Sequence, residues 1–381
     1  MHKDTLRRRT TLAAALAVTA SLMAAPAASA SSGASAPASG CDAHPIQKAL
    51  DALEHVGASG ISVTVKSPDC GLLTTGIGLA DLKTGRKVVG NEHSRIASNT
   101  KTWVATVVLQ LVGEGRLRLD DTVDHFFPGL IRTDHYDGRR ITVRQLLQHT
   151  SGLPDYLDAY ENEDDYRWDH LEPLDTVRMT LKLPPPDDRT PSGFAYSNTN
   201  YNLAGMIVSK VTGRGIGTEI KQRIIRPLGL RHTSWPGDRT TLPKPELRGY
   251  AERKGKLADR TEWNVSGADA SGALVSNGAD VTAFWSALRG GKLLAPAQLA
   301  EMEKTITTDA PSERYGLGVE RYETVPGFVT WGHSGSMESG HKLRNAVTGD
   351  GRRAVTLLIG SERFDSDKVD AIIGRLIHDL R

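Results

Sequence analysis

The sequence has few of the residues and patterns that mark metal-dependent or nucleotide-binding proteins. Its 381 residues include only two cysteines, Cys41 and Cys70, which are too few for a zinc site built from thiolates. Neither HExxH nor GxxxxGK[ST] occurs, and GRGIGT at 213–218 matches a glycine-rich phosphate loop only in part, so we interpret it as a turn. We therefore expect no metal ion and no cofactor.

A strong charge of either sign is also missing. Lys and Arg together number 47 and Asp and Glu 45, which gives a formal net charge of +2. Several of the basic residues gather at the very start of the chain, so the remainder is close to neutral. This balance argues against nucleic acid as a partner. The length is sufficient to bury a large core.

No apolar run is long enough to span a bilayer comfortably. The most apolar segment, 10–25, follows three arginines and precedes Pro26 and the Ala-Ser-Ala of 28–30, a pattern typical of a secretory signal and its cleavage site. We predict that 1–30 is a signal peptide, with a weak hint of twin-arginine export, and that the protein is secreted without a stable membrane anchor. An uncleaved anchor is the alternative. In an oxidising compartment one disulfide between the two cysteines is expected, and two free thiols are the alternative.

Strand patterns lie at both ends of the chain and helical patterns lie between them. Alternation over 60–88 predicts two or three antiparallel strands, and 328–336, 341–347 and 352–361 also match strands. We predict an α/β fold in which terminal helices flank one antiparallel sheet built from both ends, with an all-helical lobe inserted. The predicted parts are a flexible tether at 31–42, a sheet lobe at 43–97 and 246–381, and a helical lobe at 98–245, with a site in the cleft between lobes.

Ser98 and Lys101 form the first candidate catalytic pair. On a helix, residues three apart share a face, so the lysine amine would lie beside the serine hydroxyl. A serine nucleophile needs a neighbour to take its proton, and a lysine can do so when burial lowers its pKa. The alternative is that Ser98 only caps the helix. The spacing is weak evidence by itself, because Ser339 and Lys342 repeat it in a strand-and-turn region.

Two further motifs strengthen the case for a nucleophilic serine. Tyr196 and Asn198 precede a helical pattern, and a phenol can shuttle a proton while a carboxamide holds both a lysine and a substrate carbonyl. His333, Ser334 and Gly335 fall on a late strand, where the glycine would let a substrate backbone lie close. Decoys exist in the Tyr-x-Asn of 160–162 and the Lys-Thr-Gly of 83–85, but their order and context do not fit.

The segments RIASNTKTW, LLQHTSGLPDY, FAYSNTNYNLAG and WGHSGS together resemble the serine β-lactamase and penicillin-binding protein superfamily. The resemblance runs from about residue 45 to the C-terminus. It is greatest to the branch that holds class C β-lactamases, Streptomyces-type D-alanyl-D-alanine carboxypeptidases and related esterases. It implies the same fold as the pattern above.

The resemblance also implies roles for individual residues. Ser98 would be the acylated nucleophile, Lys101 its activating partner, Tyr196 the proton shuttle and Asn198 the amide that orients the substrate. His333 would replace the lysine of class C enzymes. Whether the lysine or the tyrosine is the base in acylation stays open.

The oxyanion hole is implied to consist of the backbone N–H groups of Ser98 and Ser336, with Ser334 and Gly335 beside it. The segment at 149–156 resembles a structural signature, and we assign it no catalytic role. The acidic loop at 160–173 is interpreted as a surface loop, with a lid as the alternative.

The sequence differs from the carboxypeptidases at the position that would bind the C-terminal carboxylate of a peptide substrate. The carboxypeptidases have an arginine after a YGxGx stretch, whereas this chain has Glu320 there and Arg321 one position later. On a regular strand one step turns a side chain to the other face, and only a bulge would restore it. We keep Arg321 as a candidate for binding substrate, with Lys342 or Arg344 as substitutes.

Histidine at 333 resembles the carboxypeptidases more than the class C enzymes. The resemblance therefore implies an exported D-Ala-D-Ala carboxypeptidase-like enzyme, expected as a monomer, that acts on peptidoglycan stem peptides and is acylated by β-lactams. The alternatives are an esterase, a class C-like β-lactamase, a D-amino-acid amidase or aminopeptidase, and a non-catalytic β-lactam- or peptide-binding protein. An α/β-hydrolase centred on Ser334 is disfavoured, because GHSGS lacks the final glycine of GxSxG.

Overall fold

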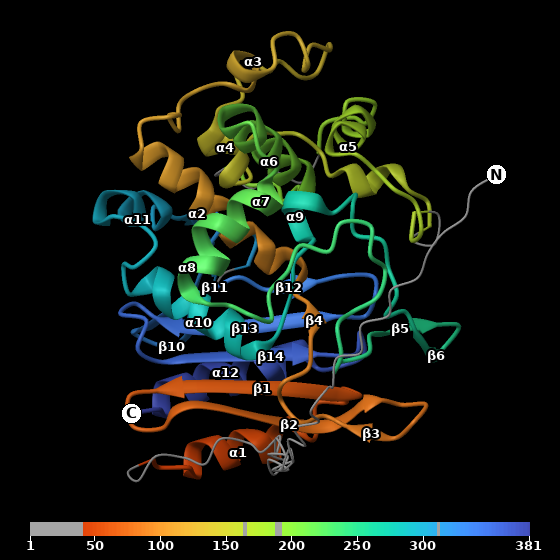
Figure 1. Ribbon diagram of the computed structural model, residues 1–381, viewed down its shortest axis with the longest axis vertical. Helices are drawn as coiled ribbons and strands as arrows, with labels where there is room; N and C mark the ends of the chain where they lie inside the picture. Colours follow the sequence, from red (N-terminus) through yellow and green to blue (C-terminus); the bar gives the residue numbers. More distant parts are fainter. Residues whose placement is uncertain (1–40, 163–165, 187–192, 311–312) are drawn as a thin grey trace, which may run out of the picture. The chain divides into compact units, whose positions relative to one another are not determined.

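An antiparallel sheet of ten strands forms the centre of the computed structural model (Figure 1). The described residues are 41–162, 166–186, 193–310 and 313–381, and all of them belong to one compact unit. The predicted signal peptide and nearly all of the predicted tether lie outside these ranges. The strands, in the order in which they pair, are β3 (Arg86–Lys87), β2 (Gly71–Asp81), β1 (Gly60–Ser67), β14 (Ala354–Ile359), β13 (Lys342–Thr348), β11 (Phe328–Gly332), β10 (Glu320–Val325), β9 (Glu313–Tyr315) and β8 (Ile306–Thr307), with β12 (Gly335–Ser336) paired to β13.

The two ends of the chain meet in the middle of this sheet. Strand β1 pairs with β2 on one side and with β14 on the other, so Ile61 lies between Ile77 and Ile359. Every residue of β14 is buried, as are seven of the eight residues of β1, because helices cover both faces. The predicted fold class, a sheet drawn from both termini, is confirmed.

The terminal helices cover one face of the sheet. Helices α1 (His44–Leu53) and α12 (Ser366–Asp379) pack on each other, and their apolar residues form one core cluster with β1 and β14. Cys41, just before α1, forms a disulfide with Cys70 in the turn between β1 and β2. The expected disulfide is therefore present, and it fastens α1 to the sheet.

The other face carries α10 (Gly278–Arg289) and, beyond it, the helices from the middle of the chain (Figure 1). Helix α2 (Thr100–Gly113) is buried on all sides, which explains its nearly continuous apolar sequence. A capping box between Thr142 and Gln145 begins α4 (Val143–Leu147). The remaining helices are α3 (Val123–Phe126), α5 (Pro173–Thr180), α6 (Asn198–Thr212), α7 (Ile216–Ile220), the π-turn η4 (Lys221–Ile225), α8 (Arg226–Leu228), α9 (Asp269–Gly272) and α11 (Pro296–Met302), with 3₁₀ turns η1 (Ala97–Asn99) and η2 (Tyr156–Ala159).

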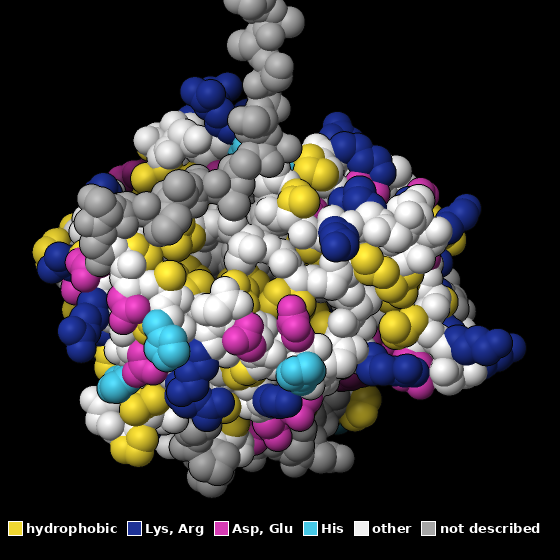
Figure 2. Space-filling model, turned by 90° about the horizontal axis from the view of Figure 1, so that it is seen from below, with side chains coloured by type: hydrophobic (Ala, Val, Ile, Leu, Met, Phe, Trp, Pro, Cys, Tyr) yellow, Lys and Arg dark blue, Asp and Glu magenta, His cyan; other side chains and the backbone are white. Residues whose placement is uncertain are grey.

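Short strand pairs complete the described part of the chain. Strand β4 (Ser94–Arg95) pairs with β7 (Val275–Ser276), and β5 (Tyr250–Arg253) pairs with β6 (Lys256–Asp259). On the face seen in Figure 2, Lys and Arg side chains are interspersed with Asp and Glu. Within the described ranges no helix has the length and apolar character needed to cross a bilayer.

Candidate active site

Ser98 lies in the turn η1, directly before the buried helix α2. The preceding residue, Ala97, has a φ of 48°, a left-handed conformation that is unfavourable for alanine. Asn99 fixes the following position by donating from Nδ2 to the backbone oxygen of His333 at 2.7 Å. Such strain persists only where its surroundings enforce it, and here it presents the Ser98 side chain at a pocket.

Lys101 is fully buried and points at the serine. Its Nζ lies 3.0 Å from Ser98 Oγ, 2.7 Å from Asn198 Oδ1 and 2.8 Å from the backbone oxygen of Ser271 in α9. Burial lowers the pKa of Lys101 to about 7, although the negative charge of Asp155 opposes the shift. The amine is therefore about half neutral at neutral pH. In that form its two N–H groups satisfy the two carbonyl oxygens, and its lone pair faces the serine hydroxyl.

Asn198, the first residue of α6, is held by a carboxylate that the sequence analysis missed. Asp155 Oδ2 accepts from the Asn198 backbone N–H at 2.9 Å and from Nδ2 at 2.7 Å. These bonds determine which way the amide points and turn its Oδ1 toward Lys101. Burial raises the pKa of Asp155, and the N–H groups of Asn198 and Leu157 oppose that rise.

Tyr196 brings its hydroxyl to Ser98 from a third direction, and the two side chains are hydrogen-bonded. Its ring stacks on His149, with centroids 4.2 Å apart. Burial of the hydroxyl raises the pKa of Tyr196 well above its usual value, so the phenol stays protonated. The pKa of His149 is lowered by burial, and its Nδ1 accepts from the Ser197 N–H, so the ring is neutral.

His333 lies behind this group rather than at its surface. Its ring is 1% exposed, with Nε2 2.9 Å from the Tyr315 hydroxyl and Nδ1 2.7 Å from the Ser334 backbone oxygen. Burial lowers the pKa of His333 to about 3. The structure therefore shows a neutral histidine with both nitrogens engaged, which positions β12 and contacts no open space.

The three residues after His333 have different surroundings. Ser334 donates from N and Oγ to the carboxylate of Glu320 at 2.7 and 3.2 Å. A Cβ at Gly335 would lie 2.4 Å from the backbone oxygen of Ile96, so the glycine is needed where β12 meets the chain before Ser98. This contact is a reason for glycine at this position in addition to the close approach of a substrate backbone, which stays a prediction. Ser336 is exposed and accepts from Lys342 Nζ at 2.6 Å.

A pocket opens at Ser98, and we call it the Ser98 pocket. It carries two carboxylates and several aromatic rings, and no basic side chain lines it within the described ranges. Part of its wall comes from the acidic loop, which the sequence analysis interpreted as a surface loop. In the same described ranges, His, Cys, Asp and Glu side chains form no group of three suited to a metal ion. The lining residues are Ala97, Ser98, Tyr156, Leu157, Tyr166, Asp169, Leu171, Asn198, Trp263, Asn264, Gly267, Ala268, Ser271, Gly272, Ser336, Met337 and Glu338.

The family model described as Beta-lactamase matches residues 46–378. The chain belongs to the Beta-lactamase family. Penicillin-binding protein 4 of Amycolatopsis lactamdurans is 27% identical over 358 residues, which cover 87% of this chain and 89% of the relative. The chain is thus a serine hydrolase of the β-lactamase and penicillin-binding protein superfamily.

Two solved structures of amide hydrolases also match this chain. A D-stereospecific amidohydrolase from Streptomyces sp. is 35% identical, with a TM-score of 0.79 over 87% of this chain and 98% of that one. D-amino acid amidase from Ochrobactrum anthropi SV3, solved with L-phenylalanine, is 28% identical, with a TM-score of 0.77 over 88% and 98%.

Arg321 is not brought to this Beta-lactamase family site. Strand β10 pairs regularly with β11 from Glu320 to Tyr322, so no bulge turns Arg321 inward, and it interacts with Glu323. Glu320 instead points into the protein, where burial raises its pKa to about 7. Arg344 pairs with Asp370 of α12, and Lys342 is the basic residue that reaches β12.

Proposed function

We propose that this protein hydrolyses amides and peptides of D-amino acids through an acyl-enzyme on Ser98. The observation that carries the proposal is the lining of the Ser98 pocket, where Asp169 and Glu338 supply carboxylates beside aromatic walls. Such a pocket suits the free ammonium and apolar side chain of an amino-acyl group. The match to two D-specific amide hydrolases supports the same class.

Acylation begins with neutral Lys101 as the base. Ser98 Oγ attacks the amide carbonyl carbon while its proton moves to Lys101 Nζ, 3.0 Å away. Tyr196 is a poor base in the resting state because its raised pKa keeps the phenol protonated. The backbone N–H groups of Ser98 and Ser336, two residues of the same pocket, would stabilise the oxyanion.

The C–N bond then breaks and the acyl group remains on Ser98 as an ester. The leaving nitrogen takes a proton from the Tyr196 hydroxyl, and the Lys101 ammonium, whose Nζ lies 4.8 Å from the centre of the Tyr196 ring, returns a proton to the phenolate. In deacylation, a water molecule loses a proton to Lys101 or Tyr196 and attacks the carbonyl carbon of the ester. The products are the free acid, the amine or ammonia, and the unmodified serine.

A D-Ala-D-Ala carboxypeptidase is the second candidate, favoured by one contact. Lys342 Nζ lies 2.6 Å from Ser336 Oγ at the exposed edge of β12, where both could bind the terminal carboxylate of a peptide. This cation would take the place of the arginine that Glu320 replaces.

The deciding experiment compares three substrates at equal concentration: D-phenylalaninamide, L-phenylalaninamide and an N-acyl-D-Ala-D-Ala peptide. We expect ammonia from the D-amide at a rate at least about tenfold above that from the L-amide. Ser98→Ala is the blank. Release of D-alanine without ammonia would establish the second candidate, and hydrolysis of nitrocefin or a short ester alone would overturn both.

A variant of Glu338 tests the ammonium contact within the proposal. Glu338→Gln is expected to raise KM for D-phenylalaninamide by about tenfold and to leave KM for N-acetyl-D-phenylalaninamide unchanged. Glu54→Gln, at the residue that follows α1, is the matched control, since it removes one exposed carboxylate far along the chain. Equal effects on both substrates would contradict a contact with the ammonium group.

A further inference from the structure

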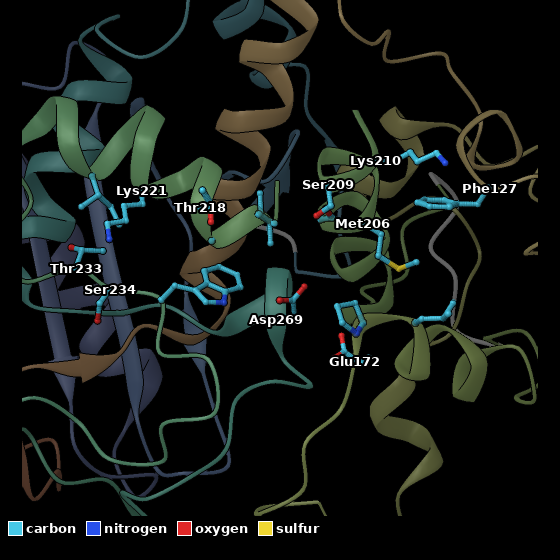
Figure 3. Close-up of a pocket in the computed structure, with 18 residues that line it drawn as sticks. Phe127, Glu172, Met206, Ser209, Lys210, Thr218, Lys221, Thr233, Ser234 and Asp269 are labelled. Atoms are coloured by element: carbon cyan, nitrogen blue, oxygen red, sulfur yellow. The ribbon is translucent and has the colours of Figure 1, made fainter. Parts of the chain in front are cut away.

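A second and larger cavity lies at the start of α9, where Asp269 lines it (Figure 3). Its volume is about 910 Å³, and none of its lining residues lines the Ser98 pocket. We call it the α9 cavity. It opens between α6, α7, the start of α5 and the segment at 233–235. The mechanism above makes no use of it.

Glycines bring the walls of this cavity close together. A Cβ at Gly217 would lie 2.6 Å from the Trp235 ring, so the indole lies directly on the α7 backbone. A Cβ at Gly205 would lie 2.6 Å from that of Ala270 and 3.6 Å from a carboxylate oxygen of Asp269. Helices α6 and α9 therefore touch, and the acid is placed in the gap between α6 and the indole.

Asp269 is the distinctive group of the α9 cavity. Within the described ranges the structure gives it no salt bridge, and its charge interacts with the backbone N–H of Ala270 and unfavourably with Glu172. Burial raises its pKa to about 7. Its φ of 35° is left-handed, a conformation that glycine, asparagine and aspartate adopt more readily than other residues. A buried carboxylate without a cationic partner is energetically costly, and a bound cation would compensate for that cost.

The other charged groups of the cavity do not form an anion site. Lys221 and Lys210 lie on opposite sides of the view in Figure 3, with Asp269 between them. Glu172 lies below Asp269 and adds a second carboxylate. The centre of the cavity is therefore acidic, and its remaining walls combine apolar side chains, such as Met206 and Trp235, with hydroxyl side chains, such as Thr218 and Thr233.

We propose that the α9 cavity binds a small organic cation, a primary ammonium group on an apolar or aromatic body. The ammonium would pair with Asp269, with Glu172 nearby, and the apolar body would lie against Trp235, Ile216 and Met206. The indole face adds attraction for a cation. Ser209, whose hydroxyl donates to the backbone oxygen of Gly205 in its own helix, borders the same space.

The short helix α9 connects the cavity with the amine of Lys101. Asp269 begins α9 and faces the cavity, while Ser271 of the same turn accepts from Lys101 Nζ through its backbone oxygen. The Ser98 pocket, with Glu338 and its aromatic walls, is the competing location for an aromatic amine. The test must therefore separate the two sites.

Isothermal titration calorimetry of the whole protein with phenethylamine at pH 8 is that test, since Asp269 is then ionised and the amine charged. We expect binding that is about tenfold or more weaker in Asp269→Asn and unchanged in Glu338→Gln. Asparagine accepts the left-handed backbone, which protects the fold. Ser209→Leu, which fills the space beside the acid while the charge stays, is expected to weaken binding as well.

2-Phenylethanol, which has the same body without the charge, is expected to bind at least about tenfold more weakly than the amine. The proposal is overturned if phenethylamine does not bind, if Asp269→Asn binds it as the wild type does, or if Glu338→Gln alone abolishes binding. None of these outcomes depends on which substrate Ser98 hydrolyses, because the measurement is binding and not turnover.

Discussion

The chain contains two Ser-x-x-Lys segments whose surroundings differ in every respect that matters for catalysis. In the first, Ser98 and Lys101 begin a helix, and the amine meets the hydroxyl at 3.0 Å. In the second, Ser339 is bonded to His341, and Lys342 reaches back along the strand pair to Ser336. Three positions along a helix return a side chain to the same face, whereas three positions along extended chain do not.

Burial is the second difference between the pairs. Lys101 is fully enclosed, so its pKa falls to about 7, while Lys342 is only partly buried at the edge of β12. Burial is what lowers the pKa of Lys101 far enough for its amine to accept a proton from the serine. The comparison therefore shows that the motif acquires chemistry from helical geometry and desolvation together.

The largest expected effect is from removing the first serine. Ser98→Ala is expected to abolish the mass increase after fluorophosphonate treatment and to lower turnover on the order of 10⁴-fold or more. Ser339→Ala is the matched variant and is expected to form the adduct like the wild type, with only about 1 kcal/mol lost from the free energy of unfolding. An adduct that disappears in Ser339→Ala alone would reverse the assignment.

The next effect concerns the two lysines. Lys101→Met is expected to lower kcat by about 10²- to 10⁴-fold, because the general base is lost. Lys342→Met is expected to change kcat for D-phenylalaninamide by less than about threefold, as for a solvated surface charge. Steady-state kinetics on both variants checks this, with melting curves to confirm that each is folded. Comparable losses in kcat would contradict the contrast.

The pH dependence follows from the state of Lys101. Acylation requires the neutral amine, so its rate is expected to rise through a midpoint near pH 7 and to level off above it. The initial burst of p-nitrophenol from an acyl ester, followed from pH 5 to 9, measures this midpoint. Lys342→Met should leave it in place. A rate independent of pH across this range would exclude lysine as the base.

The smallest effect separates Lys101 from Glu320, whose pKa is also about 7. The charge of Asp155 raises the pKa of Lys101, whereas the main charges that act on Glu320 are those of Arg344 and Asp370. Asp155→Asn is therefore expected to move the midpoint to lower pH, with a loss in kcat of about tenfold from poorer support of Asn198. Asp155→Glu should restore the midpoint. An unmoved midpoint would assign the titration to another group.

The sequence was sufficient for the architecture because the signals are periodic and long. Alternation at 60–67, the buried run at 354–359 and the helical patterns at both ends each imply one burial pattern, and the sheet satisfies all of them. The exact ends were less accessible. Val56 continues the apolar face of Ile46 and Leu53, yet α1 ends at Leu53, since helix ends depend on local caps.

The site was only partly accessible from sequence. Ser98, Lys101, Tyr196 and Asn198 come together as the motifs implied, and Arg321 does not. Asp155 was missed because its role depends on how a loop folds onto the start of α6. Its only signal was its place in LLQHTSGLPDY, a segment to which we had assigned structure alone.

The sequence alone also could not predict that the Glu320 side chain points inward or that Gly335 packs against the chain before Ser98. Both depend on contacts between strands far apart along the chain, and no local pattern records them. The acidic loop shows the same limit, since Tyr166, Asp169 and Leu171 line the Ser98 pocket although their composition is typical of a solvated surface.

The pairing of β1 with β14 has a consequence for how the molecule assembles. Its partners Ile61 and Ile359 are separated by almost the whole described chain, so the sheet cannot close until the last strand has been made. Contacts of such sequence separation slow folding and leave an open strand edge in the meantime. During synthesis the helices in the middle of the chain are therefore made before β14, the strand that completes the sheet beneath them. A chain that ended before Ala354 would leave the edge of β1 unpaired and open to self-association.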